Sequence, residues 1–102
     1  MIKQFLLKKP IFVNGTEVKS LDIDFDELDA LDMERAGKNY KEKGNYVNVI
    51  ELDAGYHFEI FCMAVSKLNS DISRSDLDRL KGKDYIEATK EVRRFFMLDS
   101  EE

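Results

Sequence analysis

The side chains best suited to catalysis or metal binding lie in one short segment of this sequence. His57 is the single histidine, Cys62 is the single cysteine, and Glu51, Asp53 and Glu59 lie nearby. On a helix, a separation of five residues turns one side chain by about 140° from the other, so His57 and Cys62 should face different sides. A structural zinc site needs about four such ligands. We therefore predict no catalytic residue, no metal site and no enzymatic activity, and we interpret the three acidic residues as helix caps and solvated charges.

Another group of acidic residues has the spacing of a calcium-binding loop but lacks the rest of that loop. Asp22, Asp24 and Asp26 follow the pattern D-x-D-x-D. The loop requires Gly at its sixth position and Glu at its twelfth, where this chain has Glu27 and Met33. We interpret the aspartates as the outer face of a strand, with Asp24 or Asp26 capping the next helix. The glycines form no phosphate-binding motif, so we predict no bound cofactor.

The segment 73–96 contains two predicted helices and several basic residues that could contact DNA. Acidic residues alternate with these basic ones, and Phe95 and Phe96 on the second helix resemble core anchors, so a solvated, salt-bridged surface explains the pattern better. The net charge of −5 also argues against binding to nucleic acid or to an anionic membrane. The basic residues are Arg74, Arg79, Lys81, Lys83, Lys90, Arg93 and Arg94.

The composition is that of a small folded domain. The chain has 102 residues, of which 43% are hydrophobic and 36% charged, which predicts a core surrounded by helices with charged outer faces. We expect a single domain over residues 1–98 and a frayed acidic tail over residues 99–102. We interpret Cys62 as a small buried hydrophobic residue. Because it has no disulfide partner in the chain and the first residues lack the features of a signal peptide, we expect a cytoplasmic location.

The first 25 residues are predicted to form a β-hairpin. Asn14 and Gly15 separate two apolar runs, and both residues tolerate the positive φ angles of a tight turn. In the second run, Leu21, Ile23 and Phe25 should share one face because side chains alternate along a strand. A lone hairpin is only marginally stable, so this one must pack against the helices that follow.

Three or four helices should follow the hairpin, which gives an α+β fold. We expect a first helix over 26–43 with Leu28 and Leu31 directed inward, whereas 46–53 is either a short strand or a loop. A central helix over 53–68 is apolar on nearly all sides. Such a helix must be covered by the rest of the chain or by a partner. We therefore expect it to be the centre of the fold, with any uncovered edge available for binding.

The C-terminal third should contain a short helix and a longer one. Ser73 and Asp76 have the spacing of a capping box for the short helix, which Gly82 should end. Asp84 is expected to cap the last helix. The apolar stripe of that last helix follows helical spacing and comprises Tyr85, Ala88, Thr89, Val92, Phe95 and Phe96.

The order of these features resembles a family of tail assembly chaperones of tailed bacteriophages. The resemblance begins in residues 21–36, LDIDFDELDALDMERA, where a strand leads into a helix of the type L-x-x-x-D-x-x-x-A. It continues through the apolar helix 56–68, the segment from Ser73 to Tyr85 and the final helix ending in VRRFF, and so covers roughly residues 11–97. The individual motifs are weak; their order and spacing carry the resemblance.

This resemblance implies a phage or prophage protein that works in the host cytoplasm. It would bind the long tape measure protein during tail assembly, keep it soluble and help to recruit tail tube subunits. Such chaperones are absent from the finished virion, and because members often self-associate, a homo-oligomer is compatible with the resemblance. The alternative interpretation is a small regulatory or adaptor domain of a mobile element that binds protein or DNA.

A chaperone for an amphipathic helix needs exposed apolar surface and no catalytic group. We expect the partner contacts among apolar residues of the middle and last helices that the core cannot absorb, and each of these residues could instead be buried within the monomer. The resemblance itself assigns no binding positions. The candidates are Tyr56, Ile60, Met63, Phe95, Phe96 and Met97.

Overall fold

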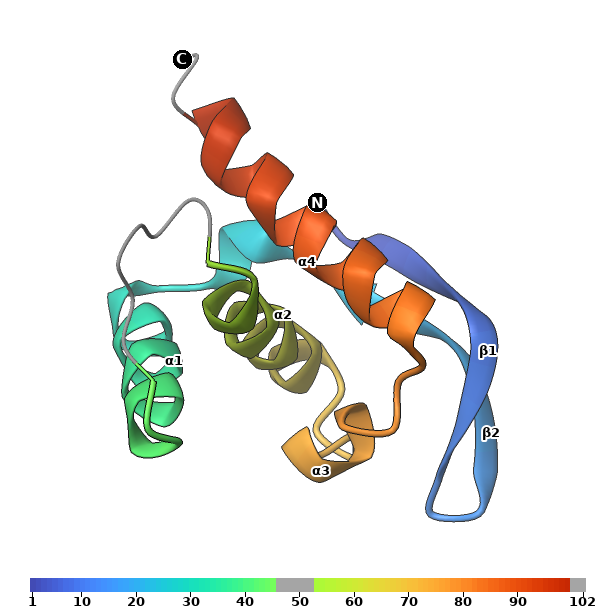
Figure 1. The fold of residues 1–102 in the computed structure, drawn as a ribbon. Helices are drawn as coiled ribbons and strands as arrows, with labels where there is room; N and C mark the ends of the chain where they lie inside the picture. The colour runs from blue at the N-terminus through green and yellow to red at the C-terminus, as the bar shows by residue number, and fades with distance from the viewer. Residues whose placement is uncertain (46–52, 100–102) are drawn as a thin grey trace.

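The chain folds as a twisted β-hairpin followed by helices that surround one central helix (Figure 1). The structure is a computed structural model that describes residues 1–45 and 53–99, with side chains up to residue 97. The predicted α+β class is confirmed, with the hairpin ahead of the helices. The elements are β1 (Lys3–Val13), β2 (Thr16–Ile23), the 3-10 turn η1 (Phe25–Glu27), α1 (Ala30–Glu42), α2 (Ala54–Leu68), α3 (Arg74–Leu77) and α4 (Gly82–Asp99).

The hairpin turns at the predicted pair, Asn14 and Gly15, whose φ angles are 51° and 80°. β1 pairs regularly with β2 up to Leu6 and again from Ile11, but residues 7–10 of β1 have only one β2 residue opposite them. This irregular segment includes a proline, which cannot donate a hydrogen bond to a ladder. The buried side of the hairpin is formed by Phe5, Ile11, Val13, Leu21 and Ile23.

A buried carboxylate joins the irregular part of β1 to α4. Asp84, which is 1% exposed, accepts hydrogen bonds from the backbone N–H groups of Lys8 (2.9 Å) and Lys9 (3.1 Å). The prediction that Asp84 caps the last helix was therefore wrong, because its side chain reaches across to the hairpin. Gly82 was also misplaced, since it begins α4 where we expected it to end the preceding helix. The capping box of Ser73 and Asp76 is confirmed at α3.

The first helix begins later than predicted. Asp24 accepts a hydrogen bond from the N–H of Asp26 and caps η1, and at 8% exposed it is not on the outer face of a strand as expected. α1 then begins at Ala30, where Asp29 and Asp32 form a capping box. Short side chains that bond to nearby N–H groups favour such local turns over a continuous helix. The 3-10 turn thus replaces the first turn of the helix that we expected over 26–43.

This later start changes which residues of α1 face the core. Leu31, predicted to point inward, is 53% exposed, whereas Leu28 between the two elements is half-buried. Ala36 is fully buried and marks the inward side of α1. Leu31 precedes Ala36 by five residues and is therefore turned by about 140° away from it.

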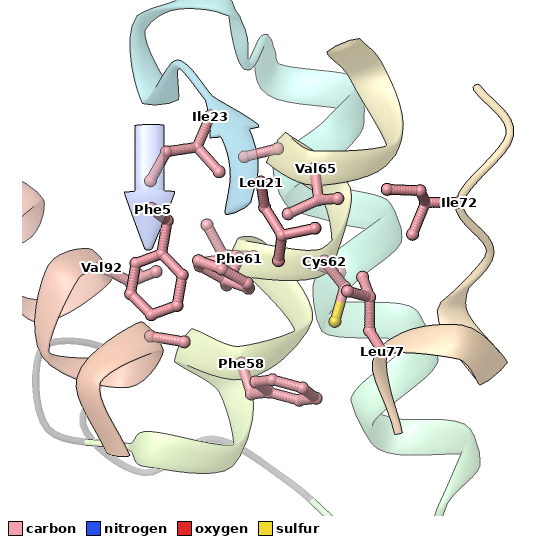
Figure 2. Packing of buried hydrophobic residues seen from close by; sticks show 14 of the residues in the cluster. Phe5, Leu21, Ile23, Phe58, Phe61, Cys62, Val65, Ile72, Leu77 and Val92 are labelled. Carbon is pink, nitrogen blue, oxygen red and sulfur yellow. The ribbon is translucent and has the colours of Figure 1, made fainter. Parts of the chain in front are cut away.

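The predicted central helix is confirmed as α2. The side chain of Asp53 caps it by accepting a hydrogen bond from the N–H of Tyr56 (3.0 Å). Each residue from Tyr56 to Cys62 is buried, because α1 and α4 flank the helix and the hairpin covers another side (Figure 1). In the core, the rings of Phe5 and Phe61 meet edge to face at 5.0 Å (Figure 2). α2 therefore meets the burial requirement that its sequence imposes.

Two predictions fall partly outside the described residues. The strand-or-loop alternative for 46–53 concerns residues 46–52, which are not described. The expected tail over 99–102 lies mostly outside the described part, because α4 ends at Asp99 and residues 100–102 are not described.

The contact between Asp84 and β1 leads to a stability prediction. Replacing Asp84 by Ala removes the acceptor of two backbone N–H groups, and we expect the free energy of unfolding to fall by about 2–4 kcal/mol. Lys83→Ala, at the exposed neighbouring residue, is the control and should change the free energy of unfolding by less than about 0.5 kcal/mol. Urea unfolding of both variants measures this difference. Equal stability of the two variants would contradict the role given to Asp84.

Candidate partner-binding surface

The three candidate contact residues on α2 are mainly part of the monomer core. Ile60 is fully buried and Tyr56 is 7% exposed, while Met63 is half-buried and packs against the core. Ile60 therefore has no surface to offer a partner unless the fold opens. Tyr56 and Met63 can contribute only their outer edges.

The three candidates on α4 lie together near the end of that helix. Phe95 and Phe96 are half-buried and Met97 is 41% exposed. Figure 1 shows the C-terminal half of α4 extending past the other elements, so that its last turns are covered on fewer sides than its first turns. The structure therefore gathers exposed apolar surface at this end of the molecule.

A row of aromatic rings connects this end of α4 to three other elements. Phe95 lies 5.4 Å from Phe25 of η1 and 5.8 Å from Phe96, measured between ring centroids. Phe96 stacks on His57 of α2 at 5.3 Å. We call this series of rings the aromatic row; its members in order are Phe25, Phe95, Phe96, His57, Tyr56 and Tyr40. It includes three of the six candidate residues, Phe95, Phe96 and Tyr56.

A surface hollow of about 260 Å³ lies beside the first two rings of this row. Its apolar lining comes from Met1, Ile23, Phe25 and Phe95. On its rim, Glu91 accepts a hydrogen bond from Lys3 at 2.6 Å and pairs with Arg94. Partial burial alone would raise the pKa of Glu91, but these basic partners, Lys3 foremost, hold it below its ordinary value. The hollow therefore has an apolar floor and a charged rim, a combination typical of protein-binding sites. 

A second hollow, of about 310 Å³, is lined in part by a buried carboxylate on α2. Glu59 is 3% exposed and accepts hydrogen bonds from Lys43 (2.8 Å) and from the Nη2 (3.0 Å) and Nε (3.2 Å) atoms of Arg74. Burial would raise the pKa of Glu59, but the hydrogen bonds from Arg74 and Lys43 outweigh this effect and lower it. The three residues link the end of α1 and the start of α3 to α2. We interpret this cluster as structural.

The chemistry-bearing residues of α2 face different elements. His57 stacks on Phe96 of α4, whereas Cys62 lies close to Leu77 of α3 (Figure 2). Burial raises the pKa of the Cys62 thiol to about 12, so at neutral pH it stays protonated and is not an activated nucleophile. The histidine and cysteine are thus not arranged as a catalytic pair.

Basic residues of the segment 73–96 form ion pairs with neighbouring acidic residues. Arg74 pairs with Asp78 as well as Glu59, and Arg79 pairs with Asp76. Further along, Lys90 pairs with Glu87 and Arg94 with Glu91. These pairs favour the interpretation of a salt-bridged surface over a nucleic-acid interface. No helix within the described ranges is long and apolar enough to span a membrane.

Comparison with known families decides the identity. A family model described as "Phage tail assembly chaperone proteins, E, or 41 or 14" matches residues 4–97. The chain belongs to this family of phage tail assembly chaperones. The comparisons with curated proteins and with solved structures gave no match. As a chaperone of tail assembly, the chain has protein partners.

Two features of this chaperone were not predicted from its sequence. Glu59 was interpreted as a solvated charge, although a lone acidic residue within an apolar helix is itself a sign of buried ion pairing. The contact of Phe25 with Phe95 was missed because Phe25 was assigned to the hairpin face. The two residues are far apart in the chain, and only the turn at η1 brings Phe25 against α4.

The Glu59 cluster predicts a pH-dependent stability. Glu59→Gln should lower the free energy of unfolding at pH 7 by about 1–3 kcal/mol, less than for a fully buried pair because Lys43 and Arg74 are partly exposed. Since the folded-state pKa of Glu59 lies below the ordinary 4.5, this contribution is complete above that pH and disappears as the pH falls through the folded-state value.

Urea unfolding at pH 7 and at a series of pH values below 4.5 measures the difference between wild type and variant. Asp78→Asn removes the exposed partner of Arg74 and should change stability by less than about 0.5 kcal/mol. A difference for Glu59→Gln that stays constant at acid pH would show that its charge is not the cause.

Proposed function

We propose that this chain binds the tape measure protein during tail assembly, keeps it soluble and helps to recruit tail tube subunits. Family membership over residues 4–97 carries the proposal, because it makes the chain a tail assembly chaperone. The tape measure protein is the partner that the resemblance implies. The action is non-catalytic and takes place in the host cytoplasm.

The binding surface in this proposal is the outer side of the aromatic row together with Met97. A long helical protein exposes apolar side chains at spacings of three and four residues, and such side chains fit grooves lined by aromatic residues. Phe95 and Phe25 line the hollow beside the row, and Met97 extends the apolar surface toward the end of α4. Tyr56 belongs to the row and supports this surface from the core. Of the other two candidates on α2, Ile60 is fully buried and Met63 can offer only its outer edge.

Charged residues on the rim of the hollow fit a transient interaction. Chaperones must release their clients, and a small apolar floor surrounded by solvated charges gives less affinity than a fully apolar interface. Lys3 and Arg94 both pair with Glu91, and the N-terminal amine pairs with Asp24 and Asp26. The positive and negative charges around the hollow therefore balance, so binding does not require a partner of one particular charge. The surface is therefore suited to many similar segments along one long helix.

Co-expression with the tape measure protein of the same phage or prophage tests the proposal. Met97→Glu places a charge in the proposed surface, and since burial of one methionine side chain contributes about 1.5–3 kcal/mol, we expect binding to weaken about tenfold or more. Less tape measure protein should then remain soluble and co-purify. Met97 is exposed enough that the variant should fold normally.

Leu31→Glu is the matched control, because Leu31 is an apolar residue exposed on a different helix, α1. It should leave both solubility and co-purification unchanged. If the wild-type chain never co-purifies with the tape measure protein and does not alter its solubility, the proposed function is wrong. If Leu31→Glu is impaired as strongly as Met97→Glu, the function stands but the assigned surface does not.

A further inference from the structure

A third hollow, of about 440 Å³, lies between the middle of β1 and the start of α4. Its volume falls within the roughly 300–1,000 Å³ that is typical of ligand pockets. Among the described residues that line it, most are exposed lysines, and the one acidic residue is the buried Asp84. We call this site the lysine hollow; its lysines are Lys8 and Lys9 of β1 and Lys81 and Lys83, which flank the first residue of α4.

Asp84 brings the two pairs of lysines together. Its carboxylate accepts the hydrogen bonds from the backbone N–H groups of Lys8 and Lys9, so this part of β1 is held against the first turn of α4 (Figure 1). Because Asp84 is 1% exposed and bonds to the backbone, its charge forms no ion pair with the lysine ammonium groups. The fold therefore gathers four positive charges from two distant parts of the chain around one hollow.

The lysines of the hollow also lack the acidic partners that most other basic residues have. Elsewhere on the same surface, for example, Arg79 pairs with Asp76. Within the described parts of the chain, no carboxylate forms an ion pair with any lysine of the hollow. Like charges that are gathered without counter-charges repel one another, and an anionic ligand relieves this repulsion. The hollow thus offers a site for a ligand with several negative charges.

The chemistry and the size of the hollow indicate an acidic peptide as this ligand. Lysines are flexible point charges that can follow carboxylates in varied positions, whereas the planar fork of arginine is the group that recognises phosphates in a fixed geometry. The chain carries a net charge of −5, so its surface outside the hollow is strongly negative. A nucleic acid or an anionic membrane would extend beyond the hollow and meet that surface. A short run of aspartates or glutamates would contact only the lysines.

We propose that the lysine hollow binds an acidic segment of a protein partner, in which several aspartate or glutamate side chains lie close together. The hollow is at the first turn of α4, whereas Phe95 of the aromatic row lies about 20 Å further along the helix. The two surfaces can therefore be occupied at the same time. The proposal is independent of the proposed chaperone function, because it concerns a different surface and a partner segment of different chemistry.

NMR titration of the isotope-labelled full chain with a capped peptide of six glutamates at low salt tests this proposal. We expect saturable chemical-shift changes at Lys8, Lys9 and residues 81–83, and none at residues 95–97. The double variants K8Q/K9Q and K81Q/K83Q each remove two of the four charges and keep the backbone N–H groups that bond to Asp84. Each variant should bind the peptide about fivefold or more weakly than wild type.

The matched control is K38Q/K41Q, because Lys38 and Lys41 are exposed lysines of α1 that also form no ion pair within the described ranges. It should bind the peptide as wild type does, and a peptide of six glutamines should not bind. The absence of saturable shifts at the hollow would overturn the proposal, as would a control that is weakened as much as the hollow variants. Tighter binding at the same lysines by a six-nucleotide single-stranded DNA or by phosphatidylglycerol vesicles would also overturn it, because the ligand would then be a phosphate.

Discussion

The structure depends on the need to bury a helix that is apolar on nearly every side. Residues Tyr56 to Cys62 of α2 can be covered only by several elements at once, and α1, α4 and the hairpin each supply one side. A two-stranded hairpin has little stability alone, and it becomes stable here because Phe5 and Leu21 pack into this core. The remaining contacts fix how the covering elements are placed around α2.

Two buried carboxylates set that placement by polar contacts. Asp84 ties α4 to the irregular segment of β1, and Glu59 ties α2 to the end of α1 and to α3. Asp84 lies in the first turn of α4, and Glu59 lies near the middle of α2. The last turns of α4 extend past this anchored region, and there the aromatic row continues the core onto the surface. The proposed binding surface is thus an exposed continuation of the core.

The sequence predicted features that depend on local patterns and missed those that depend on distant contacts. The predictions of the Asn14-Gly15 turn, of α2 and of the capping box of Ser73 were correct, because each feature depends on residues close together in the chain. The predicted start of α1 was wrong, because Asp24 caps the 3-10 turn η1 and Asp29 caps α1, so that one continuous helix does not form there. The six candidate contact residues could be named from their apolar character, but exposure depends on packing, and only the structure separates buried Ile60 from exposed Met97.

The central claim is that partner binding takes place at the C-terminal end of α4. Hydrogen–deuterium exchange of the chain with and without the tape measure protein tests this claim most directly, because exchange reports local opening residue by residue. The account predicts slower exchange on binding at Phe95 to Met97 and around η1, with little change in α3 and at the hairpin tip. Protection confined to α3 or the hairpin, with α4 unaffected, would contradict it.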